Sequence, residues 1–299
     1  MKTKKSDNLD PNDYEPLIKM ALIEDLGGVI DVNRDITSTL TLTKDLQAQA
    51  QIISRQDGII AGLEIAQSTF DHLDPEVHFS PHKNDGEFVK SGDIVATLKG
   101  NAHPILTAER TALNFIQRLS GIATTTHSFV NAIKGTKAAI TDTRKTTPGW
   151  RQLEKWAVVR GGGVNHRIGL YDAVLIKENH ATASNGLSSA INRIRKIQFE
   201  SQKDIPIFVE VERLDQIDSV IKSQPDRIML DNMGSDVMRT AVKSIRKSDP
   251  TINIEATGGF SLSTVRDAAE TGVDLISVGS LTHSAPAFDL TLLFKTAKD

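Results

Sequence analysis

RIMLDNMGSDVMRTAVKSIRKSDPTINIEATGG, residues 227–259, contains two short apolar segments, Arg227–Asp231 and Asn253–Thr257, on either side of a helical pattern. Four more segments of this kind occur, at Ala138–Asp142, Ala173–Lys177, Ile207–Glu212 and Asp274–Val278. Strands that alternate with helices at such intervals indicate βα units and a parallel sheet. Six strands are fewer than the eight of a closed (β/α)₈ barrel, so we predict an open, incomplete parallel α/β barrel.

The chain before residue 105 follows a different pattern, which predicts a small and mostly antiparallel domain. Alternation over Gln47–Ile52 indicates a strand, and Glu87–Lys99 two more. A first helix is expected after the cap residue Asp10, with its buried face formed by Leu17, Met20, Ala21 and Ile23. Thr107 is predicted to cap a second helix over Ala108–Ser120, with Leu113, Ile116 and Leu119 in the core.

The composition excludes several classes of protein. The chain has 299 residues, 39% hydrophobic and 24% charged, which is typical of a soluble globular protein. A net charge of −3 does not favour nucleic-acid binding, and no apolar run is long enough to span a membrane. No apolar segment follows the basic start, so we expect a cytoplasmic protein. The absence of Cys excludes Cys-ligated zinc and a thiol nucleophile.

Each predicted strand of the barrel ends in a charged residue or a glycine, at the edge where α/β proteins bind ligands. Between Asp142 and His180, seven basic residues outnumber four acids, which suggests a compact, multiply charged anion as ligand. We assign this role to Arg144, Lys145, Arg167 and Lys177. Arg151, Lys155 and Arg160 fit a solvated helix face instead, and we accept that interpretation for Lys155 and Arg160.

The segment GGGVNHRIGL, residues 161–170, follows a predicted helix, Arg151–Val159. One glycine of Gly161–Gly163 is expected to cap that helix, because glycine accepts positive φ. A cap needs only one glycine. We therefore predict that the others leave room for a ligand or a neighbouring backbone beside His166 and Arg167.

Two acids and two glycine-containing turns complete the predicted site. Glu210 and Asp231 end neighbouring strands, where they would hold Mg²⁺, accept hydrogen bonds from sugar hydroxyls or stabilise a cationic sugar carbon; ordinary buried ion pairs are the alternative. Thr257-Gly258-Gly259 and Gly279-Ser280 precede helices predicted from about Ser263 and Pro286. Such turns offer N–H groups to phosphate.

Several motifs together closely resemble the quinolinate phosphoribosyltransferase family. The strongest are DTRKT at 142–146, GGGVNHRIGL and DAVLIKENH at 172–180. Supporting segments occur in the family's order, at 21–38, 109–124, 209–212, 229–233, 255–260 and 278–284. Two departures are minor: Thr257 stands where the family usually has Ser, and Gly27–Asp35 matches a longer form of one motif.

The resemblance implies a reaction, an architecture and an assembly. Quinolinate would attack C1 of 5-phosphoribosyl 1-pyrophosphate and give nicotinate mononucleotide, pyrophosphate and CO₂, with Mg²⁺ as cofactor. The chain would form an N-terminal α/β sandwich over residues 1–113, to which 285–299 return, and an incomplete α/β barrel over 114–284. It would form a homodimer with sites shared across the interface, and larger assemblies are left open.

The resemblance also implies the residues of the site. Glu210, Asp231, Lys145 and Lys177 would be catalytic, and the two acids would bind Mg²⁺ directly or through water. Substrate contacts are implied for Arg110 (across the dimer interface), Thr143, Arg144, Lys145, His166, Arg167, Lys177, Glu210, Asp231, Thr257, Gly258, Gly259, Val278, Gly279, Ser280 and His283.

Three other functions compete with this one. A related phosphoribosyltransferase acting on another ring would differ at Arg144, His166 and Arg167, whose basic side chains fit a ring with two carboxylates. A non-catalytic anion sensor would not need Glu210 and Asp231 beside the sugar. A lipoyl-type carrier domain would need a Met-Lys pair at the hairpin, which the N-terminal strands lack.

Overall fold

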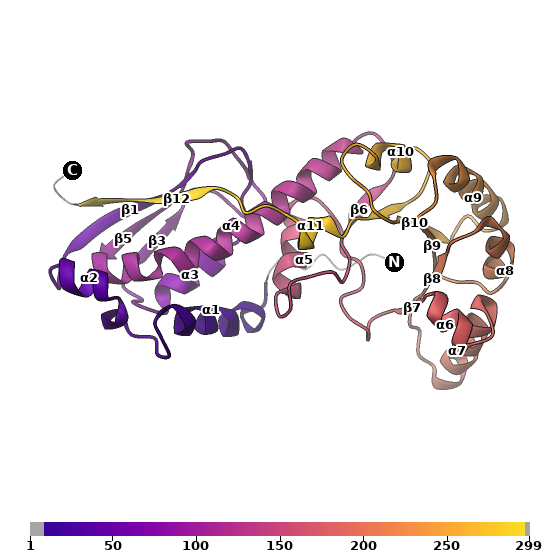
Figure 1. Cartoon of the computed structure of the whole chain (residues 1–299), viewed down its shortest axis with the longest axis horizontal. Coiled ribbons are helices and arrows are strands. Elements are labelled where there is room, and N and C mark those ends of the chain that lie inside the picture. Colours follow the sequence, from indigo (N-terminus) through magenta and orange to yellow (C-terminus); the bar gives the residue numbers. More distant parts are fainter. Residues whose placement is uncertain (1–8, 297–299) are drawn as a thin grey trace. The chain divides into compact units, whose positions relative to one another are not determined.

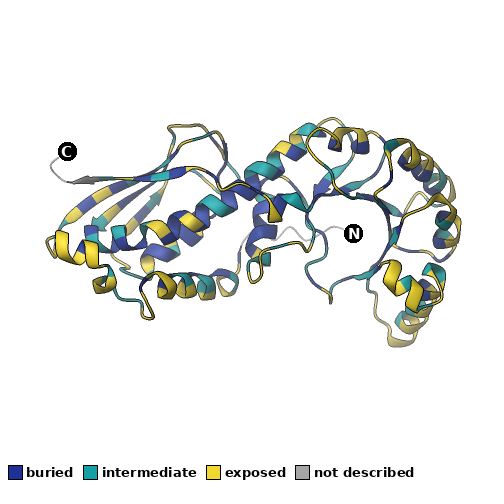
Figure 2. Cartoon of the chain, in the orientation of Figure 1, coloured by how far each residue is buried: buried dark blue, intermediate teal, exposed yellow. Residues whose placement is uncertain are grey.

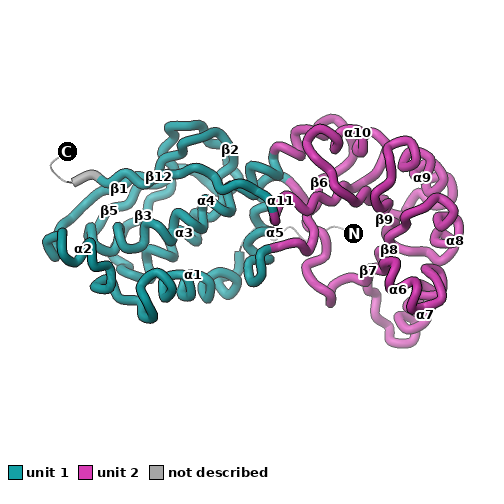
Figure 3. Tube along the Cα trace, in the orientation of Figure 1, with its two compact units in different colours: residues 1–127, 147–162, 284–299 teal, residues 128–146, 163–283 magenta. Residues whose placement is uncertain are grey.

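The computed structural model describes residues 9–296, and the chain divides into two compact units (Figure 3). The first unit comprises the described residues up to His127, the segment Thr147–Gly162 and the chain from Ser284. The second comprises Ser128–Thr146 and Gly163–His283. A compact unit defined by contacts differs from a family domain defined by sequence. The domain ranges 1–113 and 114–284 therefore stay a prediction.

The first unit is built around an antiparallel sheet. Its four strands follow the order β12-β1-β5-β3, with bounds Leu290–Thr296, Gln47–Ser54, Ile94–Asn101 and His78–Pro81. A second ribbon pairs β2 (Gly58–Ile59) with β4 (Phe88–Val89). The helices of this unit are α1 (Pro11–Asp25), η1 (Val32–Arg34), α2 (Ile36–Thr41), α3 (Leu63–Asp71), most of α4 (Ala102–Ala132) and α5 (Arg151–Arg160).

The core of this unit lies between the sheet and the helices α3 and α4. Alternate residues of β1, Ala50 and Ile52, are fully buried against Phe70 of α3 and Ile105 of α4. Figure 2 shows the same separation, with buried positions on the inner side of each element. The predicted strands and the predicted core positions of α4 are confirmed.

Two expectations for the helices of this unit were wrong. The buried face of α1 is Tyr14, Ile18 and Leu22, whereas Met20 and Ile23 are 59% and 41% exposed. The helix has two apolar faces, and the buried one contains Tyr14. The hydroxyl of Tyr14 donates to Glu64 at 2.9 Å.

Thr107 does not cap a helix. Helix α4 begins at Ala102, directly after β5, and the side chain of Asn101 accepts the N–H of His103 at 2.9 Å. Thr107 lies inside the helix, where its hydroxyl bonds the carbonyl of His103. The earlier start is consistent with Pro104 in the first turn, because proline there sacrifices no helical hydrogen bond.

The second unit contains the predicted parallel sheet. Its strand order is β6-β11-β10-β9-β8-β7, with bounds Ala139–Thr141, Leu275–Ser277, Asn253–Thr257, Arg227–Asp231, Ile207–Val211 and Val174–Ile176. The helices are α6 (Glu178–Ala183), α7 (Leu187–Ser201), η2 (Leu214–Gln216), α8 (Ile217–Lys222), α9 (Ser235–Ser248), α10 (Val265–Ala269) and α11 (Ser280–His283).

All pairings between these six strands are parallel, and helices α7 to α10 lie along the outer side of the curved sheet (Figure 1). The sheet does not close, because β6 and β7 are its two ends. The predicted fold class, a small antiparallel domain and an open parallel α/β barrel, is confirmed.

The helix expected from Pro286 is absent. The chain from Leu290 instead forms β12, which pairs antiparallel with β1 in the first unit. Pro286 suits a helix start, but Leu290, Leu292 and Phe294 alternate and pack on the sheet side of the core. Alternation of this kind predicts a strand.

Candidate active site

A cavity of about 650 Å³ opens at the carboxyl ends of the parallel strands of the second unit. Fourteen of the sixteen residues predicted to contact substrates line it. They are Thr143, Arg144, Lys145, His166, Arg167, Lys177, Glu210, Asp231, Thr257, Gly258, Gly259, Gly279, Ser280 and His283. Residues from several strand ends therefore meet at one place, as the topology of a parallel sheet requires.

The two other predicted residues lie elsewhere. Val278 is buried, and its N–H donates to the carbonyl of Thr141 at 2.9 Å, so it belongs to the sheet edge. Arg110 is an exposed residue of α4 in the first unit.

The glycine triplet ends α5, as predicted: Gly161 is the cap residue of the helix, and Gly162 has a φ of +92° just after it. A side chain on Gly161 would place its Cβ 2.3 Å from the backbone oxygen of Ala123 in α4. Of the two predicted alternatives, a ligand or a neighbouring backbone, the structure shows a neighbouring backbone at Gly161, where α5 ends close against α4.

After the triplet, the chain joins the parallel sheet briefly. Val164 forms a single parallel bridge with Thr141, and its N–H donates to the carbonyl of Ile140 at 2.8 Å. This bridge places the next residues at the strand ends. GGGVNHR therefore brings His166 to the cavity by backbone pairing rather than by flexibility.

His166 is held at its backbone and at its ring. Its N–H donates to the buried carboxylate of Asp142 at 2.9 Å, and its Nδ1 accepts the N–H of Arg167 at 2.8 Å. A ring nitrogen that accepts carries no proton, so the neutral ring has its proton on Nε2. His166 is thus fixed in one tautomer, with Nε2 buried and 3.5 Å from Glu255.

Arg167 is fixed by the loop that follows. Its Nη1 donates to the carbonyl of Ala173 at 2.9 Å, and Asp172 accepts the N–H groups of Ile168 and Gly169 at 2.7 and 2.9 Å. Burial lowers the pKa of Arg167, and the neighbouring charge of Arg144 lowers it further. Two guanidinium groups that repel each other across a cavity are suited to a ligand with two negative groups.

The predicted acids are placed differently. Glu210, from β8, accepts from the Nζ of Lys177 at 2.5 Å, while Asp231, at the end of β9, is half-buried in the cavity wall. This ion pair balances two charges in the free protein. Lys177 is half exposed, so the pair is accessible to an incoming anion.

The two turns predicted to bind phosphate line the same cavity. Gly258 has a φ of +147°, and a side chain there would approach Asn232, whereas nothing lies within 4 Å of a Cβ on Gly259. Gly279 packs tightly on Lys145, whose carbonyl accepts the hydroxyl of Thr282 at 2.7 Å. The helices after these turns, α10 and α11, are too short to add a large dipole.

Sequence reasoning missed a layer of residues at the bottom of the cavity. Glu255 is fully buried there and pairs with Arg227 at 2.7 Å, and Met229 and Leu175 add apolar surface. A signal was present: in the strand Asn253–Thr257, Glu255 shares a face with Thr257, because side chains alternate along a strand.

The family assignment comes from comparison with known proteins. The model for "Quinolinate phosphoribosyl transferase, C-terminal domain" matches residues 122–293, and the model for the N-terminal domain matches residues 35–120. The chain belongs to the quinolinate phosphoribosyltransferase family. The cavity described above is therefore interpreted as a cavity of a member of this family.

Relatives of this family align over nearly the whole chain. A probable carboxylating nicotinate-nucleotide pyrophosphorylase from Synechocystis is 41% identical, over 93% of this chain and 91% of its own. A chloroplastic protein of that name from Arabidopsis thaliana is 38% identical, over 95% and 83%. The solved nicotinate-nucleotide pyrophosphorylase from Francisella tularensis superposes with a TM-score of 0.89 and 36% identity, covering 97% and 98%.

The donor set at the cavity fits a divalent cation only in part. Carboxylate oxygens of Glu210 and Asp231 suit Mg²⁺, which binds proteins through one or two carboxylates and keeps water or phosphate as its other ligands. Over residues 9–296 no cluster of three or more His, Cys, Asp or Glu side chains is arranged to hold a metal.

Within the same range, no helix is long and apolar enough to cross a membrane.

Proposed function

We propose that this chain transfers the phosphoribosyl group of 5-phosphoribosyl 1-pyrophosphate to quinolinate and releases CO₂, pyrophosphate and nicotinate mononucleotide, a step of NAD biosynthesis. The observation that carries the proposal is the convergence of Arg144, Arg167 and His166 on one cavity, in a chain of this family. Two guanidinium groups in one cavity suit a ring that carries two carboxylates.

The basic side chains would bind the diacid. Arg144 and Arg167 present planar pairs of N–H donors that match carboxylates, and His166 lines the same cavity with its Nδ1 bound to the backbone N–H of Arg167. Lys145 and Lys177 act as point charges toward carboxylate or phosphate. Nicotinate, with one carboxylate, would leave part of this charge uncompensated.

The activated sugar would occupy the turns. The N–H groups near Thr257–Gly259 and Gly279–Ser280 are suited to the 5-phosphate and the pyrophosphate, and Thr143 and His283 lie beside them. As the ring nitrogen attacks C1, the C1–O bond to pyrophosphate breaks and the sugar becomes cationic. Glu210 or Asp231 stabilises that positive charge, and the lysines stabilise the leaving group.

Glu210 and Asp231 are the residues that would hold Mg²⁺, directly or through water. The cation, when bound with the substrate, neutralises part of the pyrophosphate charge. Holding the two substrates in line contributes several kcal/mol, on the order of 7 or more for well-oriented reactants.

Decarboxylation then needs little from the protein. After N-ribosylation the ring nitrogen carries a positive charge, which stabilises the electron pair left on C2 when the C2–carboxylate bond breaks, and C2 takes a proton after CO₂ has left. We assign no general acid or base to this step.

The assembly and the location belong to the same proposal. Arg110 supports a homodimer with shared sites, because the family resemblance gives it a substrate contact across an interface. The cytoplasmic location rests on the sequence, and the Arabidopsis relative is described as chloroplastic.

A single incubation tests the reaction. The protein is mixed with quinolinate, 5-phosphoribosyl 1-pyrophosphate and Mg²⁺, and CO₂ and nicotinate mononucleotide are measured, with nicotinate replacing quinolinate as control. We expect both products in equal amounts from quinolinate and none from nicotinate. Turnover of nicotinate at a comparable rate would refute the assignment.

A further inference from the structure

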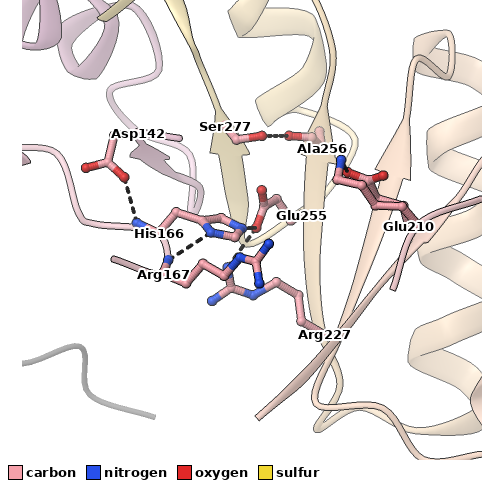
Figure 4. A network of polar contacts seen from close by, with 9 residues as sticks. Asp142, His166, Arg167, Glu210, Arg227, Glu255, Ala256 and Ser277 are labelled. Atoms are coloured by element: carbon pink, nitrogen blue, oxygen red, sulfur yellow. Dashed lines mark hydrogen bonds and ion pairs between the residues drawn. The ribbon is translucent and has the colours of Figure 1, made fainter. Parts of the chain in front are cut away.

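Glu255, Arg227 and His166 form a cluster around the buried Glu255 carboxylate, beside the predicted quinolinate site (Figure 4). Glu255 Oε2 accepts from Arg227 Nη1 at 2.7 Å, and His166 Nε2 lies 3.5 Å from the same oxygen. Phe208 completes the cluster. The Arg227 guanidinium lies over its ring at 4.2 Å, and the His166 ring meets it edge-on at 5.5 Å.

The strand register explains why these residues meet. Phe208 is paired with Arg227 and Arg227 with Asn253, one level below the pairing of Glu210, Met229 and Glu255. Asp231 and Thr257 form the level above. Successive levels are two residues apart along each strand and therefore face the same side of the sheet, so Glu255 lies between the level of Phe208 and Arg227 and the level of Asp231 and Thr257.

Charge is expensive at this position, which makes a role for it worth seeking. Glu255 is not exposed at all, and Arg227 is 13% exposed. Burial raises the pKa of Glu255, whereas the charge and hydrogen bond of Arg227 and a hydrogen bond with Ser277 lower it. Well-packed apolar residues often replace such pairs without loss of stability, so stability alone is weak grounds for a buried pair.

Both ring nitrogens of His166 have defined surroundings in this cluster. The Arg167 N–H faces Nδ1, and the Glu255 carboxylate faces Nε2. An acceptor next to Nε2 favours the proton there and holds the plane of the ring, as carboxylates do for metal-binding histidines.

We propose that Glu255 is a positioning residue for the quinolinate site, acting through His166. Its carboxylate holds the imidazole in the orientation and tautomer in which Nδ1 accepts the N–H of Arg167, and this contact fixes the segment that carries the Arg167 guanidinium. Arg227 has the separate task of compensating the charge of Glu255. The inference rests on the proposed function, because it assigns Arg167 to quinolinate.

The ion pair itself offers matched variants, since Glu255 is the member whose carboxylate lies 3.5 Å from His166 Nε2. Glu255→Gln removes the charge that faces the ring and keeps the size. Arg227→Met removes the other charge and keeps an unbranched side chain over Phe208. The double variant, Arg227→Met with Glu255→Gln, has no unpaired buried charge.

Calorimetric titration of each full-length protein with quinolinate and, separately, with 5-phosphoribosyl 1-pyrophosphate and Mg²⁺ tests the proposal. Glu255→Gln should weaken quinolinate binding by about tenfold to a hundredfold, the range seen when a histidine loses its orienting partner, with the sugar phosphate affected less than about threefold. Arg227→Met should change quinolinate binding by less than about threefold, although it lowers the melting temperature.

The double variant carries the test if Glu255→Gln does not fold. It should be more stable than Glu255→Gln and should bind quinolinate equally weakly, because it also lacks the carboxylate. If the ion pair were purely structural, quinolinate binding would follow the stability of each protein, and the double variant would bind quinolinate more tightly than Glu255→Gln. Equal quinolinate binding in wild type and in a folded Glu255→Gln or double variant overturns the positioning role. Loss of binding in Arg227→Met as large as in Glu255→Gln overturns it too.

The same titrations separate this proposal from the proposed function. If the wild-type protein does not bind quinolinate, the proposed function fails and the role of Glu255 fails with it. If the wild type binds and the variants follow the structural pattern, only the role of Glu255 is lost.

Discussion

Two groups of basic residues that are neighbours in the sequence have opposite surroundings in the structure. Arg151, Lys155 and Arg160 belong to α5 in the first unit, and Lys155 is only 1% exposed. Arg144 and Lys145 lie in the cavity wall of the second unit and are exposed. An excess of positive charge along the sequence therefore does not locate a binding site by itself.

The difference lies in what each group of charges contacts. On α5, Glu154 is fully buried and accepts from Arg118 at 2.8 Å and from the hydroxyl of Thr147 at 2.8 Å, and the Arg160 guanidinium lies over the Trp156 ring. These contacts satisfy charges inside the protein. The expectation that Lys155 solvates a helix face was wrong, because all residues of α5 from Leu153 to Val158 are buried.

The cavity residues keep much of their hydrogen-bonding capacity for a ligand. Arg167 is fixed by one nitrogen at the Ala173 carbonyl and retains other donors. Buried charges with internal partners stabilise a fold, whereas charges fixed at one point and accessible at another can bind. Each prediction below tests one side of this distinction.

The largest effect is expected at Arg144. Arg144→Ala should reduce kcat/KM for quinolinate by about two to three orders of magnitude, since a charge-assisted contact to a carboxylate is lost. The melting temperature should stay within about 1 °C, because surface substitutions without internal partners barely change stability. Steady-state kinetics and thermal unfolding measure the two effects.

Arg239→Ala is the matched control for this variant. Arg239 is an exposed arginine of α9 that pairs with Asp236 on its own helix. Both kcat/KM and melting temperature should be unchanged there. Wild-type kinetics in Arg144→Ala would remove Arg144 from the site.

The mirror image is expected at Glu154. Glu154→Ala should lower the free energy of unfolding by about 3 kcal/mol, because Arg118 and Thr147 lose a buried partner. Chemical denaturation measures the loss. The control is Glu270→Ala, which removes a surface pair with Arg266 and should cost less than about 1 kcal/mol. If both variants lose the same amount, the buried network of α5 does not support the fold.

Much of the second unit could be predicted from sequence because its rules are local. Each strand of the parallel sheet is a short apolar run bounded by polar residues, and the carboxyl ends of such strands must share one edge. For this reason fourteen predicted residues line a single cavity. The family resemblance named most of these residues, and the strand topology explains why they share one cavity.

The errors occurred where packing between distant segments decides. The buried stripe of α1 depends on Glu64, fifty residues later, and the close contact of Gly161 depends on the backbone of Ala123. Glu255 escaped notice because a lone acid in an apolar strand gives no indication of its partner. Arg227 and His166 approach it only after three separate segments have folded.

Arg110 is an exception to this distinction, because it is a basic residue of the first unit to which the family resemblance gives a role in substrate binding. Arg110→Ala should lower kcat/KM by about a hundredfold, as for a cation contacting a charged substrate. Mixing it with Arg144→Ala should restore activity to about a quarter of wild type, because half of the dimers are mixed and each rebuilds one of two sites.

A second mixture provides the control for this complementation. Arg144→Ala and Lys177→Ala both change residues of the same cavity, so a mixed dimer of these two contains no intact site. Activity should not recover. Equal recovery in both mixtures, or none in either after subunit exchange has been verified, would contradict a site shared between subunits.

The smallest effects are expected at two glycines, one that packs inside the first unit and one that lines the cavity. Gly161→Ala forces a Cβ against the α4 backbone and should lower the free energy of unfolding by about 1–3 kcal/mol, as overpacking does. Gly259→Ala meets nothing within 4 Å of its Cβ, so stability should stay within about 0.5 kcal/mol of wild type. A methyl group beside the turn should still weaken the sugar phosphate by about tenfold, equivalent to one hydrogen bond to a charged group. Denaturation and kinetics on both variants should give opposite profiles, because Gly161 serves the packing of the first unit and Gly259 the surface of the cavity. The reverse result would have Gly161→Ala impairing only catalysis and Gly259→Ala only stability. It would place the glycine triplet in the binding site and contradict the separation of structural residues from binding residues.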